Sequence, residues 1–122
     1  MAFPLPASAA LVDMNFSEFL GEVKKLNFQQ VRTDQPDYLE CVLGKDLLTG
    51  LTPLLENYFG PAVKPPGKSP KGKDQEISSP LGGIQKNQTL YWAQRNGSIE
   101  LAMLWPWGDG VSVTLKMARR SQ

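Results

Sequence analysis

The sequence predicts an α+β fold in two layers, in which one or two amphipathic helices cover a C-terminal antiparallel sheet. Asn96-Gly97 gives a strong hairpin signal between two strand-like segments. Large apolar side chains recur at helical spacing within residues 46–59. The length of 122 residues fits one domain over residues 1–122.

The C-terminal third predicts a three-stranded meander over residues 88–117. Asn96-Gly97 suits a two-residue turn because both central positions of that turn need a positive φ. If residues 106–110 form the next connection, residues 111–117 make the third strand. One face of the meander is then apolar, and it is made of Leu90, Trp92, Ile99, Leu101, Met103, Trp105, Val111, Val113, Leu115 and Met117.

The other face of the meander is expected to meet solvent. It carries Tyr91 and Arg95, and the same register sets Glu100 opposite Lys116 as a pair of opposite charges. Aromatic and basic side chains together on a sheet are one way to bind single-stranded nucleic acid. The aromatic-and-glycine pattern of such sheets is absent and Glu100 lies in the middle of this face, so the pattern does not identify a nucleic-acid site.

Two helices are predicted before the meander. Apolar residues recur on one side of residues 16–26, and Asp13 or Ser17 can cap this helix. The second helix covers residues 46–59, where Pro53 either kinks it or begins a further helix. We expect the second helix, with help from the first, to cover the apolar face of the sheet.

The remaining N-terminal segments are less regular. Residues 1–12 are expected to be a loose lead-in rich in proline and alanine, and residues 28–32 a short strand. The spacing within residues 38–43 also suits a helix. We choose a strand that extends the sheet, because Gly44-Lys45-Asp46 is typical of a break followed by a new helix cap.

Residues 60–86 are predicted to form a long loop rich in glycine, proline and lysine, since they hold five glycines and five prolines. Residues 67–74 nearly match a phosphate-binding loop. Asp74 stands where the hydroxyl should be, Lys64-Pro65-Pro66 precedes the motif instead of a strand, and no helix pattern follows it, so we expect no such site. The lysines of this loop that remain candidates for binding are Lys64, Lys68, Lys71 and Lys73.

The residue inventory argues against common catalytic chemistry. The sequence has no histidine, which removes the commonest general acid–base and the commonest metal ligand. Acidic residues are scattered, so we expect no metal site and no cofactor. No catalytic residue is assigned; Ser78, Ser79 and Lys86 are candidates only because they lie in the unexplained loop.

The single cysteine and the short hydrophobic segments favour a location in the cytoplasm. A single cysteine cannot form an intrachain disulfide, which fits a reducing cytoplasm, and Cys41 is expected to be a small buried hydrophobe. The apolar stretches are too short to span a bilayer. The N-terminal residues lack a positively charged segment, and Pro4 and Pro6 interrupt them, so we expect no signal peptide.

Our leading hypothesis is a non-catalytic binding module with an unknown protein partner. Its surface would combine residues 60–86 with the connection that holds Trp107. Aromatic side chains in exposed loops are enriched at binding sites. A loop tryptophan also often folds back to cap the open end of a sheet, and this is the commoner role.

The uneven charge of the two halves of the sequence, and the unpaired edge expected for strand 111–117, leave other functions open. Residues 64–122 carry a net charge of +5 and residues 1–63 a net charge of −4. The basic half favours binding of nucleic acid or another polyanion through residues 64–73, Arg119 and Arg120, although the two halves can also simply attract each other. A small-ligand-binding domain or a histidine-independent enzyme is a further alternative. A homodimer through the edge of strand 111–117 is also possible, since nothing in the sequence pairs that edge.

Overall fold

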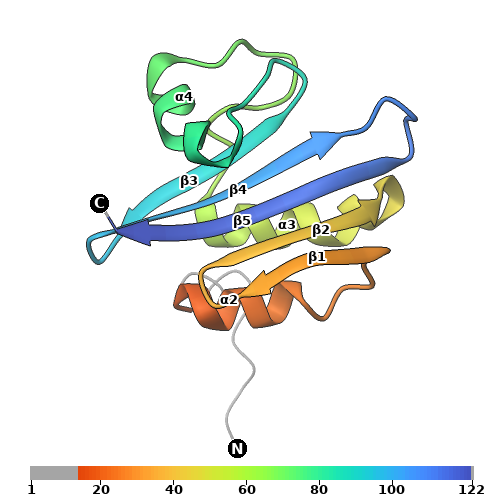
Figure 1. Cartoon of the computed structure of the whole chain (residues 1–122), viewed down its shortest axis with the longest axis horizontal. Helices are drawn as coiled ribbons and strands as arrows, with labels where there is room; N and C mark the ends of the chain where they lie inside the picture. The colour runs from red at the N-terminus through yellow and green to blue at the C-terminus, as the bar shows by residue number, and fades with distance from the viewer. Residues whose placement is uncertain (1–13, 122) are drawn as a thin grey trace, which may run out of the picture.

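The computed structural model describes residues 14–121, and the expected lead-in over residues 1–12 lies outside them. Within the described part the chain is an α+β fold built on a five-stranded antiparallel sheet of order β1-β2-β5-β4-β3 (Figure 1). The elements are α2 (Phe16–Val23), β1 (Gln30–Gln35), β2 (Tyr38–Gly44), α3 (Leu48–Phe59), α4 (Gly72–Ser78), β3 (Thr89–Arg95), β4 (Ser98–Pro106) and β5 (Ser112–Ser121), with 3₁₀ turns at Lys45–Leu47 and Ser79–Leu81.

Helix α2 begins at a cap that the sequence pattern did not identify. The Asn15 side chain accepts a hydrogen bond from the Glu18 backbone N–H at 2.8 Å, and the Glu18 carboxylate accepts one from the Asn15 N–H at 3.1 Å. This reciprocal pair is a capping box. Ser17 lies inside the helix and does not cap it, and Asp13 lies outside the described residues.

Helix α3 confirms the leucine-rich helix expected over residues 46–59. It continues through Pro53 as one helix, so no second helix starts there. It ends at Gly60, whose φ of 85° favours glycine. Leu51, Leu55 and Tyr58 are the side chains that α3 buries.

Residues 38–43 form a strand, as expected, and that strand changes the topology. β2 pairs with β1 on one side and with β5 on the other. Because β5 also pairs with β4, strand 111–117 is central, and the expectation that one of its edges is unpaired is wrong. β1 is an outer strand of this sheet; a bulge between Val31 and Thr33 and its charged residues make it a poor edge for further pairing.

The register of the β3–β4 hairpin is confirmed, whereas the register of β4 against β5 is corrected. Trp92 opposes Leu101, as the hairpin signal predicts. Trp105 opposes Thr114 instead of Val111, and Glu100 opposes Arg119 instead of Lys116. The observed register differs from the expected one by an odd number of residues. Each side chain of β5 therefore lies on the face of the sheet opposite to the one expected for it.

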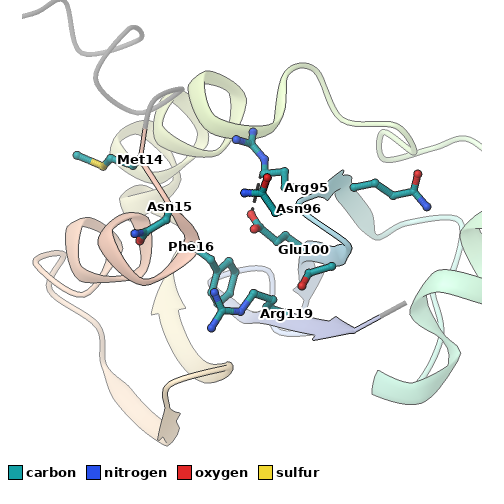
Figure 2. A pocket seen from close by; sticks show the side chains of 9 residues that line it. Met14, Asn15, Phe16, Arg95, Asn96, Glu100 and Arg119 are labelled. Atoms are coloured by element: carbon teal, nitrogen blue, oxygen red, sulfur yellow. Dashed lines mark ion pairs between the residues drawn. The ribbon is translucent and has the colours of Figure 1, made fainter.

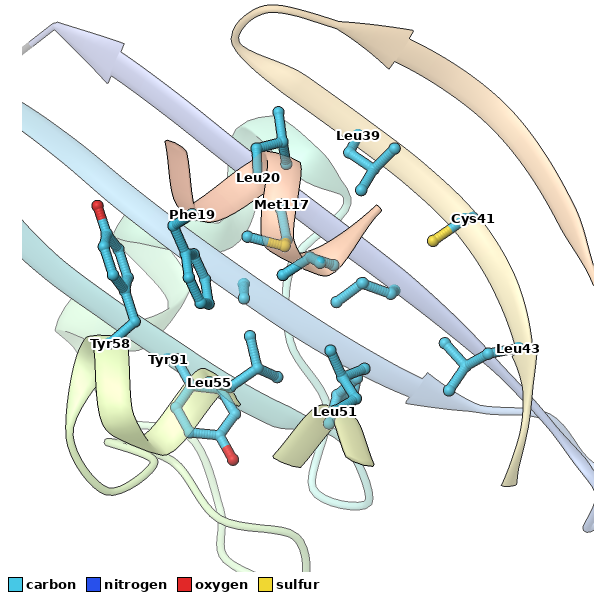
Figure 3. Close-up of a cluster of buried hydrophobic side chains, with 14 of the residues drawn as sticks. Phe19, Leu20, Leu39, Cys41, Leu43, Leu51, Leu55, Tyr58, Tyr91 and Met117 are labelled. Atoms are coloured by element: carbon cyan, nitrogen blue, oxygen red, sulfur yellow. The ribbon is translucent and has the colours of Figure 1, made fainter. Parts of the chain in front are cut away.

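The reason for this error is that both faces of the sheet are covered, so β4 is buried along almost its whole length and periodicity does not identify one inner face. Helices α2 and α3 cover the face that was expected to meet solvent, which holds Tyr91, Ala102 and Leu104 (Figure 3). The opposite face, with Leu90, Leu101 and Met103, packs against the segment that contains α4.

The segment 60–86 is therefore more ordered than a long loop. It contains α4 and the turn Ser79–Leu81, and it contributes Ile77 and Ile84 to the second core. Backbone hydrogen bonds in both directions join Lys64 to Leu90 on the outer side of β3. In residues 14–121 no helix has the length and apolar character needed to cross a membrane.

Candidate functional site

The face of the sheet beneath α2 and α3 changes from apolar to charged toward the β3–β4 hairpin. Along β4 this face carries Leu104 and Ala102, and then Glu100. On β5 the corresponding position opposite Glu100 is Arg119. Glu100 is nevertheless 5% exposed, so a carboxylate is buried where the hydrophobic core ends.

Helix α3 fixes this carboxylate through Tyr58. The Tyr58 hydroxyl donates a hydrogen bond to Glu100 Oε1 at 2.5 Å. The Tyr58 ring is itself held by a parallel stack on Phe19 of α2, with centroids 4.0 Å apart and an interplanar angle of 2°. Burial, followed by the hydrogen bond to Glu100, raises the pKa of Tyr58, so its hydroxyl stays protonated as a donor.

Arg95, at the end of β3, packs over the same tyrosine. Its guanidinium carbon lies 4.2 Å from the Tyr58 ring centroid, and Nη2 donates to the Tyr58 carbonyl. Arg95 Nε lies 3.6 Å from Glu100 Oε1, which is an ion-pair distance too long for a hydrogen bond. This buried Nε has no hydrogen-bond partner in residues 14–121.

Arg119 is held in place by Asp37, which lies in the turn between β1 and β2. Its Nε and Nη2 both donate to Asp37 Oδ1, at 3.0 and 2.7 Å. Its guanidinium also lies 5.6 Å from the Phe16 ring centroid. Asp37, Arg119 and Glu100 thus alternate in charge across neighbouring strands.

A pocket of about 710 Å³, which we call the hairpin pocket, is lined by Glu100, Arg95 and Arg119. Figure 2 shows Glu100 between Arg95 and Arg119. Within the described part of the chain, no hydrogen bond or ion pair reaches the second oxygen of Glu100, Oε2. The other residues that line the pocket are Met14, Asn15, Phe16, Gln94, Asn96 and Ser98.

The hairpin pocket presents charges of both signs on rigid supports. Two guanidinium groups and one carboxylate can hold a small polar ligand by charge-assisted hydrogen bonds. Residues 14–121 contain no cluster of three or more acidic or cysteine side chains that could hold a metal ion. Smaller pockets of about 400 and 170 Å³ lie beside the β4–β5 connection.

Lys64 and Tyr91 do not lie where the sequence interpretation placed them. Lys64 is 1% exposed, and its Nζ donates to the carbonyls of Lys86 and Gln88 at 2.5 Å and of Pro65 at 3.1 Å. Burial lowers the pKa of Lys64. Tyr91 is 3% exposed, and burial raises its pKa to about 12. Their expected exposure to a surface ligand is wrong.

The other cations of the basic segment are dispersed. Lys68 and Lys71 are exposed, while Lys73 pairs with Glu76 at 3.8 Å and lies 6.0 Å from the Trp92 ring centroid. Arg120 Nη2 donates to the Ile77 carbonyl at 2.7 Å. None of these cations lines the hairpin pocket; of the residues proposed for binding, Arg95 and Arg119 line it.

Trp107 lies on the sheet and is still partly exposed. Its Nε1 donates to Thr114 Oγ1 at 2.8 Å, and Arg32 lies 5.7 Å from its ring centroid. With 40% of its surface exposed, the side chain both covers the sheet and meets solvent. No hydrogen bond, ion pair or cation–π contact in residues 14–121 joins Trp107 to residues 60–86, which the expected binding surface combined with it.

The loop residues named as catalytic candidates have structural roles or are exposed. Ser78 is buried, and its hydroxyl donates to the Asp74 carbonyl at 2.7 Å within α4. Ser79 and Lys86 are exposed. The residues that sequence reasoning missed as a site are Tyr58 and Glu100. The available signal was one acidic residue in the otherwise apolar run of β4.

Comparisons with models of protein families, with curated proteins and with solved structures gave no match for this chain.

Proposed function

We propose that this chain is a non-catalytic binding module and that the hairpin pocket is its ligand site. The observation that carries the proposal is Glu100. Oε1 is held by Tyr58, whereas Oε2 has no hydrogen bond to residues 14–121 and is not one of their fully buried unpaired atoms, so it opens to the pocket and can accept a hydrogen bond from a ligand. A ligand that donates to Oε2 would complete the set of partners.

The chemistry of the pocket favours binding over catalysis. The raised pKa of Tyr58 opposes formation of a phenolate nucleophile at neutral pH. Ser98 also lines the pocket, but within residues 14–121 its hydroxyl has no hydrogen bond to a base. Arg95 and Glu100 are held by neighbouring groups, as preorganised recognition requires.

A polyanion fits this arrangement less well than a small ligand does. Lys64 is buried, Arg120 donates to the Ile77 carbonyl, and the exposed Lys68 and Lys71 lie outside the hairpin pocket. The hairpin pocket itself places a carboxylate between two guanidinium groups (Figure 2). A phosphate backbone would meet repulsion from Glu100 at the centre of the site.

The proposal is tested by titrating the ¹⁵N-labelled full chain with a library of small polar compounds. Compounds that bind should shift the amide signals of Asn96, Glu100 and Arg119, because these residues line the pocket. Glu100→Gln should lower the affinity for those compounds by at least about tenfold, since it removes a charge-assisted partner. Glu76→Gln is the matched control, because Glu76 is exposed on α4.

Two results would overturn the proposal. One is a library in which every binding compound shifts signals outside the hairpin pocket, or in which no compound binds. The other is equal affinity of the pocket-binding compounds for the Glu100→Gln and Glu76→Gln variants.

A further inference from the structure

We infer that the ligand of the hairpin pocket is a free amino acid, with its ammonium group at Glu100 and its carboxylate at Arg95 and Arg119. This inference rests on the proposed function and names the class of ligand for the same site. It depends on the polar atoms of charged groups that the pocket leaves without hydrogen bonds, on the spacing of those groups and on the volume available.

The unpaired atoms of the pocket include both donors and an acceptor. Arg95 uses Nη2 for the Tyr58 carbonyl, and Arg119 uses Nε and Nη2 for Asp37. Each guanidinium therefore keeps Nη1 without a hydrogen bond to residues 14–121. Glu100 keeps Oε2 in the same way.

These unpaired atoms select against ligands of a single charge. A simple carboxylic acid satisfies the arginines but places a second anion beside Glu100. A simple amine satisfies Glu100 but adds a third cation to Arg95 and Arg119. A zwitterion avoids both penalties, so its affinity should exceed that of either half.

The spacing of the charges favours a free amino acid over a peptide. Glu100 and Arg119 are direct partners across β4 and β5. Side chains in such a pair start from Cβ atoms about 5 Å apart. The ammonium and carboxylate of one α-amino acid are separated by a single carbon, whereas the two termini of a peptide lie further apart.

The volume of the hairpin pocket is sufficient for such a ligand. About 710 Å³ lies within the range of small-molecule sites. The charged groups occupy one part of it, and Met14 lines it as well. The pocket therefore has room for the side chain of the amino acid.

The test is calorimetry and ¹⁵N chemical-shift titration of the full chain with each of the standard L-amino acids. The tightest-binding amino acid is then compared with its deaminated acid and its decarboxylated amine. We expect each analogue to bind at least about tenfold more weakly, because each lacks one charge-assisted contact.

Variants assign the two ends of the ligand. Glu100→Gln should lower the affinity for the amino acid by at least about tenfold, and should leave the affinity for the deaminated acid unchanged or higher. Arg119→Gln should lower the affinity for the amino acid and for the deaminated acid, and should leave the affinity for the decarboxylated amine unchanged or higher. Glu76→Gln is the control, and the amide spectrum of each variant reports whether it is folded.

The inference is overturned if no amino acid shifts the pocket signals at about 10 mM, or if a dipeptide binds more tightly than every amino acid. If other polar compounds still bind at Glu100 and Arg119, the proposed function stands and the ligand class is wrong. If no compound of any kind binds there, both are wrong.

Discussion

Tyr58 and Glu100 lie 42 residues apart in the sequence, and they share a hydrogen bond of 2.5 Å between a phenol and a buried carboxylate. This bond joins the last turn of α3 to the beginning of β4, next to the β3–β4 hairpin. It holds the helix to the sheet at the point where the apolar core ends and the charged pocket begins. The same contact therefore contributes to stability and orients the candidate site.

We expect Tyr58→Phe to lower the free energy of unfolding by about 1–3 kcal/mol, because Glu100 loses its hydrogen-bond donor while remaining buried. In a double-mutant cycle with Glu100→Gln, the coupling should be at least about 1 kcal/mol by urea denaturation. Tyr38→Phe is a matched control, since Tyr38 donates to Glu40 at 2.5 Å in a partly exposed pair. Additive effects of Tyr58→Phe and Glu100→Gln would contradict the account.

Lys64→Met should destabilise the fold by about 2–3 kcal/mol, since three backbone carbonyls lose a charged donor. Methionine keeps much of the apolar stem, so the change isolates the ammonium group. Lys68→Met serves as the control in the same segment, because Lys68 is exposed, and it should stay within about 0.5 kcal/mol of the wild type. Equal midpoints for the two variants in urea would show that the Lys64 contacts are not important.

Gly82→Ala should destabilise the protein by about 1–3 kcal/mol. A Cβ at this position would lie 2.7 Å from the ring of Trp105, and the φ of 106° is unfavourable for alanine. Gly21→Ala provides the contrast, since Gly21 is exposed in α2 and a Cβ there meets nothing within 4 Å. It should stabilise the protein by about 0.5–1 kcal/mol in thermal or urea denaturation. A neutral Gly82→Ala would mean that the turn does not pack on Trp105.

The buried thiol of Cys41 predicts a loss of stability at high pH. Burial, followed by the charge of Glu40, raises the pKa of Cys41 from 9.0 to about 12. The folded state thus retains a proton that the unfolded state releases, so this stability is present below pH 9 and is lost as the pH rises toward 12. The loss is about 1.4 kcal/mol per pH unit in that window.

The contribution of Cys41 is isolated by comparison with Cys41→Ala. Between pH 8.5 and 10.5 the wild type should lose about 2 kcal/mol more than the variant, by urea denaturation at each pH. Tyrosines and lysines titrate in both proteins and cancel in the difference. Parallel losses in the two proteins would show that the thiol is not held protonated by the fold.

Local chemistry made part of the fold predictable. Asn96-Gly97 set the β3–β4 register because a two-residue turn leaves no freedom in the pairing next to it. The leucine-rich segment identified α3 because its apolar residues recur at helical spacing. The break at Gly44 likewise indicated that residues 38–43 form a strand that ends there, and the structure confirms this strand as β2.

Long-range packing determined what could not be predicted. β4 is buried on both faces, so its sequence does not show which face α3 covers or how β5 aligns with it. Glycines and prolines flank α4, and so short a helix gives little periodicity. The site was missed for the same reason: Glu100 was assigned to solvent, whereas it is buried beside Arg119 and beneath Tyr58.

The register of β4 against β5 is the feature on which the hairpin pocket depends, and cross-strand NOEs measure it directly. We expect contacts between Glu100 and Arg119 and between Leu101 and Ala118. Contacts of Glu100 with Lys116 instead would place Arg119 on the opposite face of the sheet from Glu100. The pocket, its proposed ligand and the charge arrangement described above would then all be wrong.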